Sequence, residues 1–211
     1  MRPKHLSCWI VAWLVLCGPM VSRGSAEMIT FDSSRGLDDF EFAKTGGGKP
    51  GEWSIARGDA IQALAQTSTD TTDNRFPLAI YRPFSGRDVD VSTRFLPVAG
   101  KVDQAGGIAI RLKSANDYYV VRANALEDNV RFYRVVGGKR EQLAGANIKV
   151  ASKIWHVLGL VAKGDRFTVS LDGRELFTAT DRTFAGAGRV GFWTKSDSVT
   201  WFERLDFESL D

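Results

Sequence analysis

Planar hydrogen-bond donors and aromatic rings occur together in one stretch of the sequence, between residues 106 and 143. Guanidinium and amide groups bond pairs of neighbouring hydroxyls, and an aromatic ring covers the apolar face of a pyranose. This mixture is typical of a sugar-binding surface. The residues expected to line one face of a sheet are Arg111, Arg122, Asn124 and Arg131, with Tyr118 and Tyr133 among them. Glu127 or Asp128, Trp193 and Lys195 are expected to complete the surface from a nearby turn and a later strand.

The alternative for this face is a purely structural one. The same side chains would then be solvated and joined by cross-strand ion pairs, each contributing about 0.2–1 kcal/mol. Residue types alone do not choose between a ligand face and a solvated face, because a polar outer surface is expected of a sheet in either case. Both interpretations stay open at this point.

Groups suited to acid–base or metal chemistry are scarce. His156 is the only histidine after residue 26, so a pair of histidine ligands is excluded, and we expect a partly buried histidine hydrogen-bonded to a neighbour. Asp70, Asp73 and Asn74 offer oxygen ligands in one loop, but they lack the spacing of a calcium cage. The sequence therefore predicts no metal site and no cofactor, and it contains no Gly-x-Ser-x-Gly nucleophile motif.

The elements that must position these residues are short β-strands. Ile108, Ile110 and Leu112 alternate with Arg111 and Lys113, which is the period of a half-buried strand. The expected strands lie near Met28–Phe31, Trp53–Ala56, Ala60–Ala65, Leu78–Tyr81, Val89–Leu96, Gly107–Lys113, Tyr118–Asn124, Val130–Val136, Arg140–Leu143, Trp155–Ala162, Arg166–Leu171, Glu175–Thr180, Arg189–Thr194 and Val199–Phe207.

Turn signals between these strands favour antiparallel pairing. Asp172-Gly173 and Lys163-Gly164-Asp165 separate neighbouring strands late in the chain, and Asp-Gly suits a hairpin turn. The segments Lys44–Gly51 and Thr67–Asn74 are predicted to be surface loops. Many short strands without a helical period predict an all-β fold in which two antiparallel sheets pack face to face, as in a jelly roll.

The first 26 residues have the features of a secretory signal peptide. Arg2 and Lys4 precede an apolar run that is too short to cross a bilayer, and small residues follow at positions 24–26. Residues 27–211 are then expected to be a single exported domain, periplasmic or extracellular, with no transmembrane segment. A lipid anchor on Cys17 is the alternative, and it is disfavoured because the large residue Leu16 precedes the cysteine.

Removal of this leader changes the composition. Both cysteines lie in it, so the exported domain must be stable without disulfides. Three of the 28 Lys and Arg residues lie in the leader and none of the 25 Asp and Glu residues, which leaves the remainder balanced. A nucleic-acid partner is therefore not expected. The oligomeric state is left open.

Two long segments carry a family resemblance. The first is GGIAIR followed by DYYVVRANALEDNVRFYRV, and the second is WHVLGLVAKGDRFTVSLDGRELF followed by GRVGFWTKSDSVTWFERLDF. Together they resemble the concanavalin A-like lectin/glucanase superfamily, and within it the bacterial exported group named for 3-keto-disaccharide hydrolases, related to laminin-G-type modules. The resemblance implies a jelly roll with a concave sheet face and a link to sugars. It does not imply one activity, because the fold carries several.

Glucanases of that superfamily use a Glu-x-Asp-x-x-Glu strand, whose carboxylates stand at the separation that retention of configuration requires, ~5–5.5 Å. Glu203, Asp206 and Glu208 come nearest to this pattern here. Asp206 follows Glu203 by three residues, so the two are expected to face opposite sides of a strand. Ordinary glucanase activity is not predicted.

The tryptophans are expected to divide between core and surface. Trp155 begins the fold motif that ends at Gly173, and with Trp201 it is predicted to lie in the core because both belong to strands of alternating apolar residues. Trp193 is the better ligand candidate, since Phe192 then takes the inward position.

Three functions remain compatible with the sequence. The first is a secreted lectin-like module that binds carbohydrate on the arginine-rich face. The second is an enzyme acting on an oxidised sugar such as a 3-keto glycoside, with Glu127, Asp128 or His156 as base and Arg111 or Arg122 stabilising the enolate oxygen. The third is a structural or protein-interaction module without a small ligand.

Overall fold

The computed structural model describes residues 26–32, 37–58 and 61–211. The predicted signal peptide, up to residue 25, and both cysteines lie outside the described residues. Within the described part, no helix has the length and apolar character that crossing a membrane requires.

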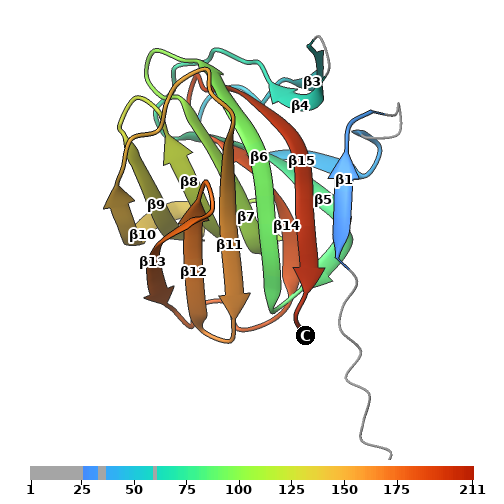
Figure 1. Cartoon of the computed structure of the whole chain (residues 1–211), viewed down its shortest axis with the longest axis vertical. Helices are drawn as coiled ribbons and strands as arrows, with labels where there is room; N and C mark the ends of the chain where they lie inside the picture. Colours follow the sequence, from blue (N-terminus) through green and yellow to red (C-terminus); the bar gives the residue numbers. More distant parts are fainter. Residues whose placement is uncertain (1–25, 33–36, 59–60) are drawn as a thin grey trace, which may run out of the picture.

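The described residues form two antiparallel sheets packed as layers (Figure 1). The eight-stranded sheet runs in the order β13 (Arg174–Thr180), β12 (Arg166–Leu171), β11 (His156–Lys163), β6 (Val89–Ala99), β15 (Val199–Ser209), β4 (Gln62–Gln66) and β3 (Trp53–Arg57), with β1 (Glu27–Thr30) also paired to β15. The seven-stranded sheet runs in the order β10 (Lys139–Asn147), β9 (Asn129–Val136), β8 (Asp117–Asn124), β7 (Ala105–Ser114), β14 (Gly188–Thr194), β5 (Arg75–Gly86) and β2 (Phe40–Gly46). The predicted two-sheet sandwich is confirmed.

Alternation along each strand decides which side chains enter the core between the layers. On β8, Tyr119 and Val121 point into the core, whereas Tyr118 and Arg122 point to the outer face of the seven-stranded sheet. On β14, Phe192 is in the core and stacks on Phe202 of the opposite sheet at 4.4 Å between ring centroids. The predicted inward position of Phe192 is therefore confirmed.

The expectation for Trp155 and Trp201 is wrong. Both are half-buried and lie outside the core, because the inward positions next to them belong to His156 and Phe202. The guanidinium carbon of Arg94 lies 4.7 Å from the centroid of the Trp155 ring on the outer face of the eight-stranded sheet. Consecutive residues of an extended chain point to opposite faces, and the smaller neighbour takes the inward place in each case.

The strand β2 was not expected, since part of it was read as the loop from Lys44 to Gly51. Its residues pair with β5 from Phe40 opposite Tyr81 to Gly46 opposite Arg75. The second predicted loop, from residue 67 to residue 74, is confirmed as a connection without strand structure.

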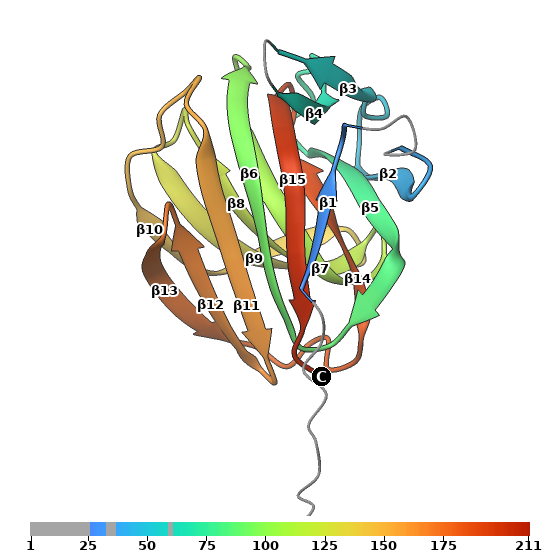
Figure 2. The same cartoon turned by 45° about the vertical axis from the view of Figure 1, so that its right-hand side comes forward.

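A second apolar cluster lies on the outer face of the seven-stranded sheet. Its buried members come from five adjacent strands, β9, β8, β7, β14 and β5, whose order can be followed from left to right in Figure 1. Figure 2 shows β9, β8 and β7 behind the eight-stranded sheet. They are Phe76, Leu78, Ile80, Ala105, Ala109, Leu112, Tyr118, Val120, Tyr133, Val135 and Trp193. The polar residues predicted from the sequence assemble around this second apolar cluster, on the same outer face of the sheet.

Candidate functional site

The floor of the candidate site, called the aromatic floor below, consists of the buried rings of Phe76, Tyr118, Tyr133 and Trp193. Trp193 of β14 stacks on Phe76 of β5, with 5.2 Å between the ring centroids, and neither ring is open to solvent. Trp193 Nε1 donates a hydrogen bond to the Tyr118 hydroxyl at 3.2 Å. That hydroxyl also lies 2.8 Å from Thr45 Oγ1, which itself donates to a backbone carbonyl. The Tyr118 proton is therefore directed at Thr45.

Burial raises the pKa of Tyr118 to about 12, although its hydrogen bonds with Thr45 and Trp193 oppose the shift. The phenol is accordingly neutral at physiological pH, and its hydroxyl is held in place by hydrogen bonds with Thr45 and Trp193. Trp193 lies on the outer face of its sheet, but its ring has no exposed surface, which corrects the expectation that the indole is open to a ligand.

Arg140 of β10 covers the aromatic floor, and the sequence did not single it out. Its guanidinium carbon lies 4.4 Å from the centroid of Tyr133, 4.8 Å from that of Phe76 and 5.8 Å from that of Trp193. Arg140 pairs with Val135 across the sheet, which directs its side chain to the outer face. Arginine stacked on aromatic rings is a recurrent arrangement, because the ring faces are electronegative.

Arg122 and Glu127 form an ion pair at one side of the floor. Arg122 Nη2 lies 2.7 Å from Glu127 Oε2, and the same nitrogen donates to the Tyr133 hydroxyl at 3.3 Å. Arg122 also donates to Asn129. Burial alone would raise the pKa of Glu127, but Arg122 and Asn129 outweigh it and hold this pKa below its usual value. Glu127 is therefore an anion beside a fixed guanidinium.

Lys195 forms a second charged group, close enough to the first to lower the pKa of Glu127. Its ammonium lies 2.7 Å from the carboxylate of Asp73 and 2.7 Å from that of Asp103. Asn124 Nδ2 donates to the second oxygen of Asp103 at 2.6 Å. Burial raises the pKa of Asp103 against the opposing effect of Lys195. Burial would lower the pKa of Lys195, but its bonds to Asp103 and Asp73 raise it.

The structure therefore brings most of the predicted residues together on one face. They are Tyr118, Arg122, Asn124, Glu127, Tyr133, Trp193 and Lys195, with Arg131 beside them. Arg131 pairs with Arg122 across the sheet and binds Asn147 at 2.6 Å. The residues that sequence reasoning missed are Phe76, Asp73, Asp103, Asn129 and Arg140. Asp73 had been considered only as a calcium ligand, and Arg140 only as the start of a strand.

Arg111 does not belong to this face, which corrects the expectation. Its backbone has a positive φ of 48°, in an irregular stretch of the β7–β8 pairing, and its side chain is only 1% exposed. The guanidinium donates to the carbonyls of Arg87, Phe184 and Gly164 at 2.7–2.9 Å. All these partners are loop carbonyls, so Arg111 fixes loops and is not available to a ligand.

Two of the three proposed bases, His156 and Asp128, are held in structural contacts. His156 is buried, with Nδ1 2.8 Å from Asp172 and Nε2 3.0 Å from the carbonyl of Ala151, so the expected hydrogen-bonded histidine is confirmed. Asp128 lies on the surface, 2.9 Å from Lys149. Glu127 is the candidate base that lies beside a candidate electrophile.

The carboxylates of β15 lie on the opposite side of the molecule. The pairing of β15 with β6 shifts by one residue between Phe202 and Arg204, and Glu203 and Asp206 both lie on the outer face as a result. The expectation that they face opposite sides is therefore wrong. Glu203 Oε2 lies 2.6 Å from Arg94, and Arg204 contacts both carboxylates.

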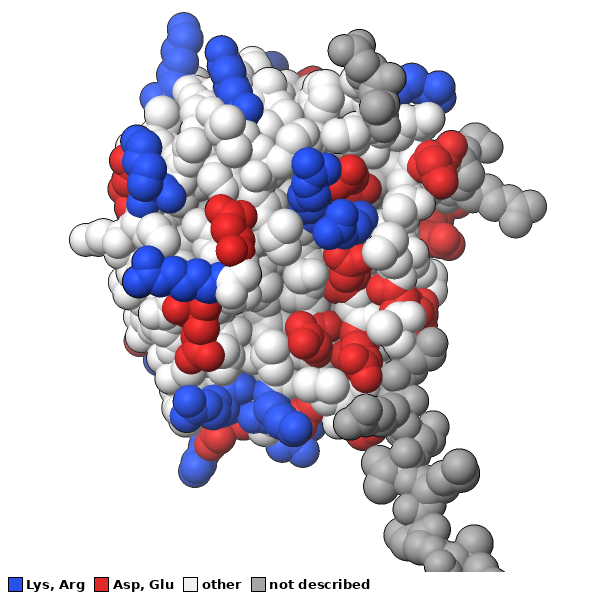
Figure 3. Space-filling model, viewed as in Figure 1, with Lys and Arg blue, Asp and Glu red and all other residues white. Residues whose placement is uncertain are grey.

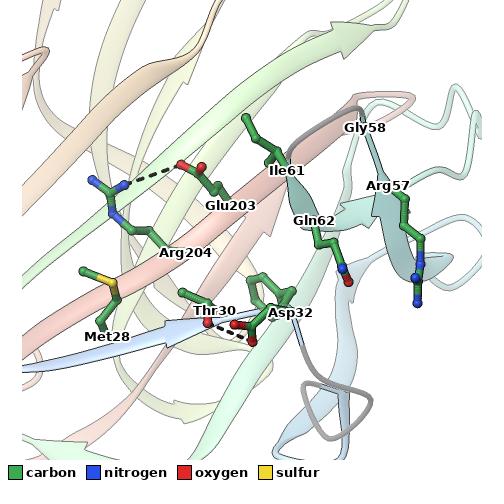
Figure 4. A pocket seen from close by; sticks show the side chains of 10 residues that line it. Met28, Thr30, Asp32, Arg57, Gly58, Ile61, Gln62, Glu203 and Arg204 are labelled. Atoms are coloured by element: carbon green, nitrogen blue, oxygen red, sulfur yellow. Dashed lines mark hydrogen bonds and ion pairs between the residues drawn. The ribbon is translucent and has the colours of Figure 1, made fainter.

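A groove of about 610 Å³ lies beside Glu203 and Arg204, between β1, β15 and the β3–β4 region. Figure 4 shows the side chains that line it. Figure 3 shows the same side of the molecule, where basic and acidic side chains are interspersed. Arginines neutralise Glu203 and Asp206 in place, which is typical of a solvated sheet face and not of an acid–base pair. Within residues 26–32, 37–58 and 61–211, no group of three or more His, Cys, Asp and Glu side chains is arranged to hold a metal ion.

Solved structures of the same architecture include three bacterial proteins. The carbohydrate-binding module CBM66 from Bacillus subtilis is 22% identical, with a TM-score of 0.62, and the match covers 80% of this chain and 95% of that one. A Bacillus subtilis protein of unknown function with a galectin-like fold has a TM-score of 0.64 at 11% identity, covering 90% and 98%. A β-glucanase from Bacillus licheniformis has a TM-score of 0.58 at 10% identity, covering 89% and 99%.

These similarities define the fold class. The chain has the jelly-roll sandwich of concanavalin A-like lectins and glucanases, as the sequence resemblance implied. No protein-family model and no curated protein matches the sequence. The narrower resemblance to the 3-keto-disaccharide hydrolase group stays a prediction.

Proposed function

We propose that the protein is an exported carbohydrate-binding module whose ligand lies on the outer face of the seven-stranded sheet. One observation carries this proposal: Arg122, Glu127 and Lys195 are fixed in charged networks around a cluster of buried aromatic rings. Such networks present hydrogen-bond donors and acceptors in set directions, which is what binding of sugar hydroxyls requires. The fold similarity to a carbohydrate-binding module supports the same conclusion, and the features of the leader support export.

The test is a glycan array followed by calorimetric titration of the sugars that bind. Arg122→Gln should weaken binding at least about tenfold, since it removes a planar charged donor from the face. Arg94→Gln is the matched control, because Arg94 forms a comparable ion pair with Glu203 on the opposite sheet. The proposal is wrong if no glycan binds at millimolar concentration, or if both variants weaken binding equally. A structural or protein-interaction module would then be the better description.

A second candidate function follows from the contact between Glu127 and Arg122. In a 3-keto glycoside, Glu127 would remove the proton from the carbon next to the ketone, and Arg122 would stabilise the enolate oxygen. Collapse of the enolate would break the glycosidic bond and release the second sugar as an alcohol after protonation. The lowered pKa of Glu127 makes it a weak base for this step, so binding remains the preferred function.

Incubation with a 3-keto-disaccharide and product analysis by NMR separate the two candidates. Turnover that disappears in Glu127→Gln, while the variant still binds sugar, would establish the enzyme. Binding without any product in the wild-type protein would exclude this candidate.

A further inference from the structure

Arg140 lies over the aromatic floor and forms no ion pair with any of the described residues, although its charge lowers the pKa of Asp73. Arg122 is paired with Glu127, and Lys195 is paired with two aspartates. No carboxylate of the described residues lies within 4 Å of the Arg140 guanidinium. Its Nη1 is buried and has no hydrogen-bond partner among the described residues. A buried charged donor without an acceptor is costly, so this position favours a ligand that brings an oxygen acceptor to the guanidinium.

The aromatic rings do not supply what Arg140 lacks. Tyr133, Phe76 and Trp193 lie within 4.4–5.8 Å of the guanidinium carbon and provide cation–π attraction. Cation–π contacts act on the charge, whereas the N–H groups at the edge still require oxygen acceptors. The rings therefore hold the guanidinium in a fixed orientation with unused donors.

The acceptor that suits the Arg140 guanidinium has a definite chemistry. A planar guanidinium with free N–H groups matches a carboxylate, which accepts two parallel hydrogen bonds and neutralises the charge. Sugar hydroxyls satisfy the donors but leave the charge unmatched. Arg140 lies on the same face as Arg122, since both guanidinium groups approach the Tyr133 ring, at 4.4 and 5.9 Å respectively. A carboxylate at Arg140 and hydroxyls at Arg122 are therefore within reach of one ligand.

We propose that Arg140 binds the carboxylate of an acidic sugar, so that the ligand class of this face is a uronic-acid glycan. The inference rests on the proposed carbohydrate-binding function and narrows it. Arg140 acts as the group that distinguishes acidic from neutral glycans, while Arg122 and Glu127 bind hydroxyls common to both.

The experiment compares acidic sugars with their neutral methyl esters, using calorimetric titration of the exported domain. The probes are trisaccharides of galacturonate, mannuronate and glucuronate, each beside its fully methyl-esterified form. At least one acid should bind about tenfold more tightly than its ester. Arg140→Gln should abolish the preference for the acid, so that acid and ester bind with affinities within about twofold of each other.

Lys139→Gln is the matched control. Lys139 is the neighbouring exposed residue on β10 and pairs with Val136, so its side chain faces the other side of the sheet from that of Arg140. The substitution Lys139→Gln changes the net charge by the same amount as Arg140→Gln. It should leave the preference for the acid unchanged. If Arg140→Gln does not fold, as judged by circular dichroism, Arg140→Lys keeps the charge but loses the planar pair of donors, and it should weaken acid binding about fivefold.

Three outcomes would overturn the inference, and they are distinguishable. If acids and esters bind equally and Arg122→Gln weakens both, Arg140 does not recognise a carboxylate, but the carbohydrate-binding function stands. If neither these probes nor any neutral glycan binds at millimolar concentration, the function fails and the inference fails with it. Tighter binding of a sulfated trisaccharide than of every uronate would also overturn the assignment to a carboxylate.

Discussion

The ammonium of Lys195 lies 2.7 Å from Oδ2 of Asp103, a carboxylate with no exposed surface. Asp103 belongs to the loop before β7, and Lys195 follows directly after β14, so their contact ties a loop to the end of the neighbouring strand. Asp73, whose side chain is 67% exposed, shares the same ammonium. One lysine thereby links a buried and an exposed acid at the border of the candidate site.

Removal of this lysine should be strongly destabilising. Lys195→Met leaves the Asp103 carboxylate buried beside an apolar side chain, and we expect a loss of about 3–5 kcal/mol in the free energy of unfolding. Urea unfolding monitored by tryptophan fluorescence measures it. Asp73→Asn is the control and should cost less than about 1 kcal/mol, because Asp73 is mostly exposed and Asp103 keeps its partner. Similar losses for the two variants would contradict the structural role given to Asp103.

Trp193 should behave as a core residue although it lies on an outer sheet face. Trp193→Ala removes a fully buried indole that stacks on Phe76, and it should cost about 3–5 kcal/mol in the free energy of unfolding. Trp201→Ala is the matched comparison, since Trp201 is half-buried on the other sheet, and its loss should be clearly smaller. Chemical denaturation of both variants tests this order. The reverse order would mean that the second apolar cluster contributes little to stability.

Alkaline pH should destabilise the fold through Tyr118. Its pKa is about 12 when folded and about 10 in the unfolded chain, so the unfolded state loses its proton first as the pH rises. The stabilisation is therefore complete below pH 10 and is lost between about pH 10 and 12, by roughly 2–3 kcal/mol. Urea midpoints measured from pH 8 to 11.5 should fall, and Tyr118→Phe should make this fall shallower. An unchanged slope in the variant would show that Tyr118 is not the responsible group.

His156 should prove structural. His156→Phe removes hydrogen bonds to Asp172 and to the carbonyl of Ala151, and we expect a loss of about 1–3 kcal/mol in unfolding free energy. Sugar affinity, or turnover of a 3-keto-disaccharide, should stay within about twofold of the wild-type value. A variant that remains stable but loses either activity would return His156 to the list of catalytic candidates.

The strands of the meander could be predicted because most of their residues alternate, although the alternation breaks at Arg111, which leaves Ile110 in the core and Leu112 in the second cluster. Between Gly106 and Val136, the buried apolar side chains face the core or the second cluster, Leu126 and Val136 are exposed, and the turn residues fall where the chain reverses. The strand β2 was missed because its residues, FEFAKTG, end in a run of glycines that favours a loop. The side of the sheet on which Glu203 and Asp206 lie was missed for a different reason: a bulge changes the alternation, and no local residue pattern announces it.

The site could be predicted only in part, because its members come from distant parts of the chain. Arg122, Asn124 and Tyr133 belong to one meander and share a face by the period of the strand. Arg140 contacts Phe76, which is remote in sequence, and that contact depends on where β5 lies in the sheet. Asp73 and Asp103 reach Lys195 from two loops, whose positions follow from packing and not from alternation.

By itself, the sequence determined that the chain forms an antiparallel sandwich, since a period of two with turn residues between strands leaves few other ways to bury the apolar side chains. It also determined which residue types a sugar face would use. The tertiary structure decided which of them meet. Arg111 binds loop carbonyls, the Trp193 ring is buried under neighbouring side chains, and Arg140 lies over the aromatic rings. The physical reason is that periodicity acts between neighbours in the chain, whereas strand order, bulges and loop packing depend on the whole fold.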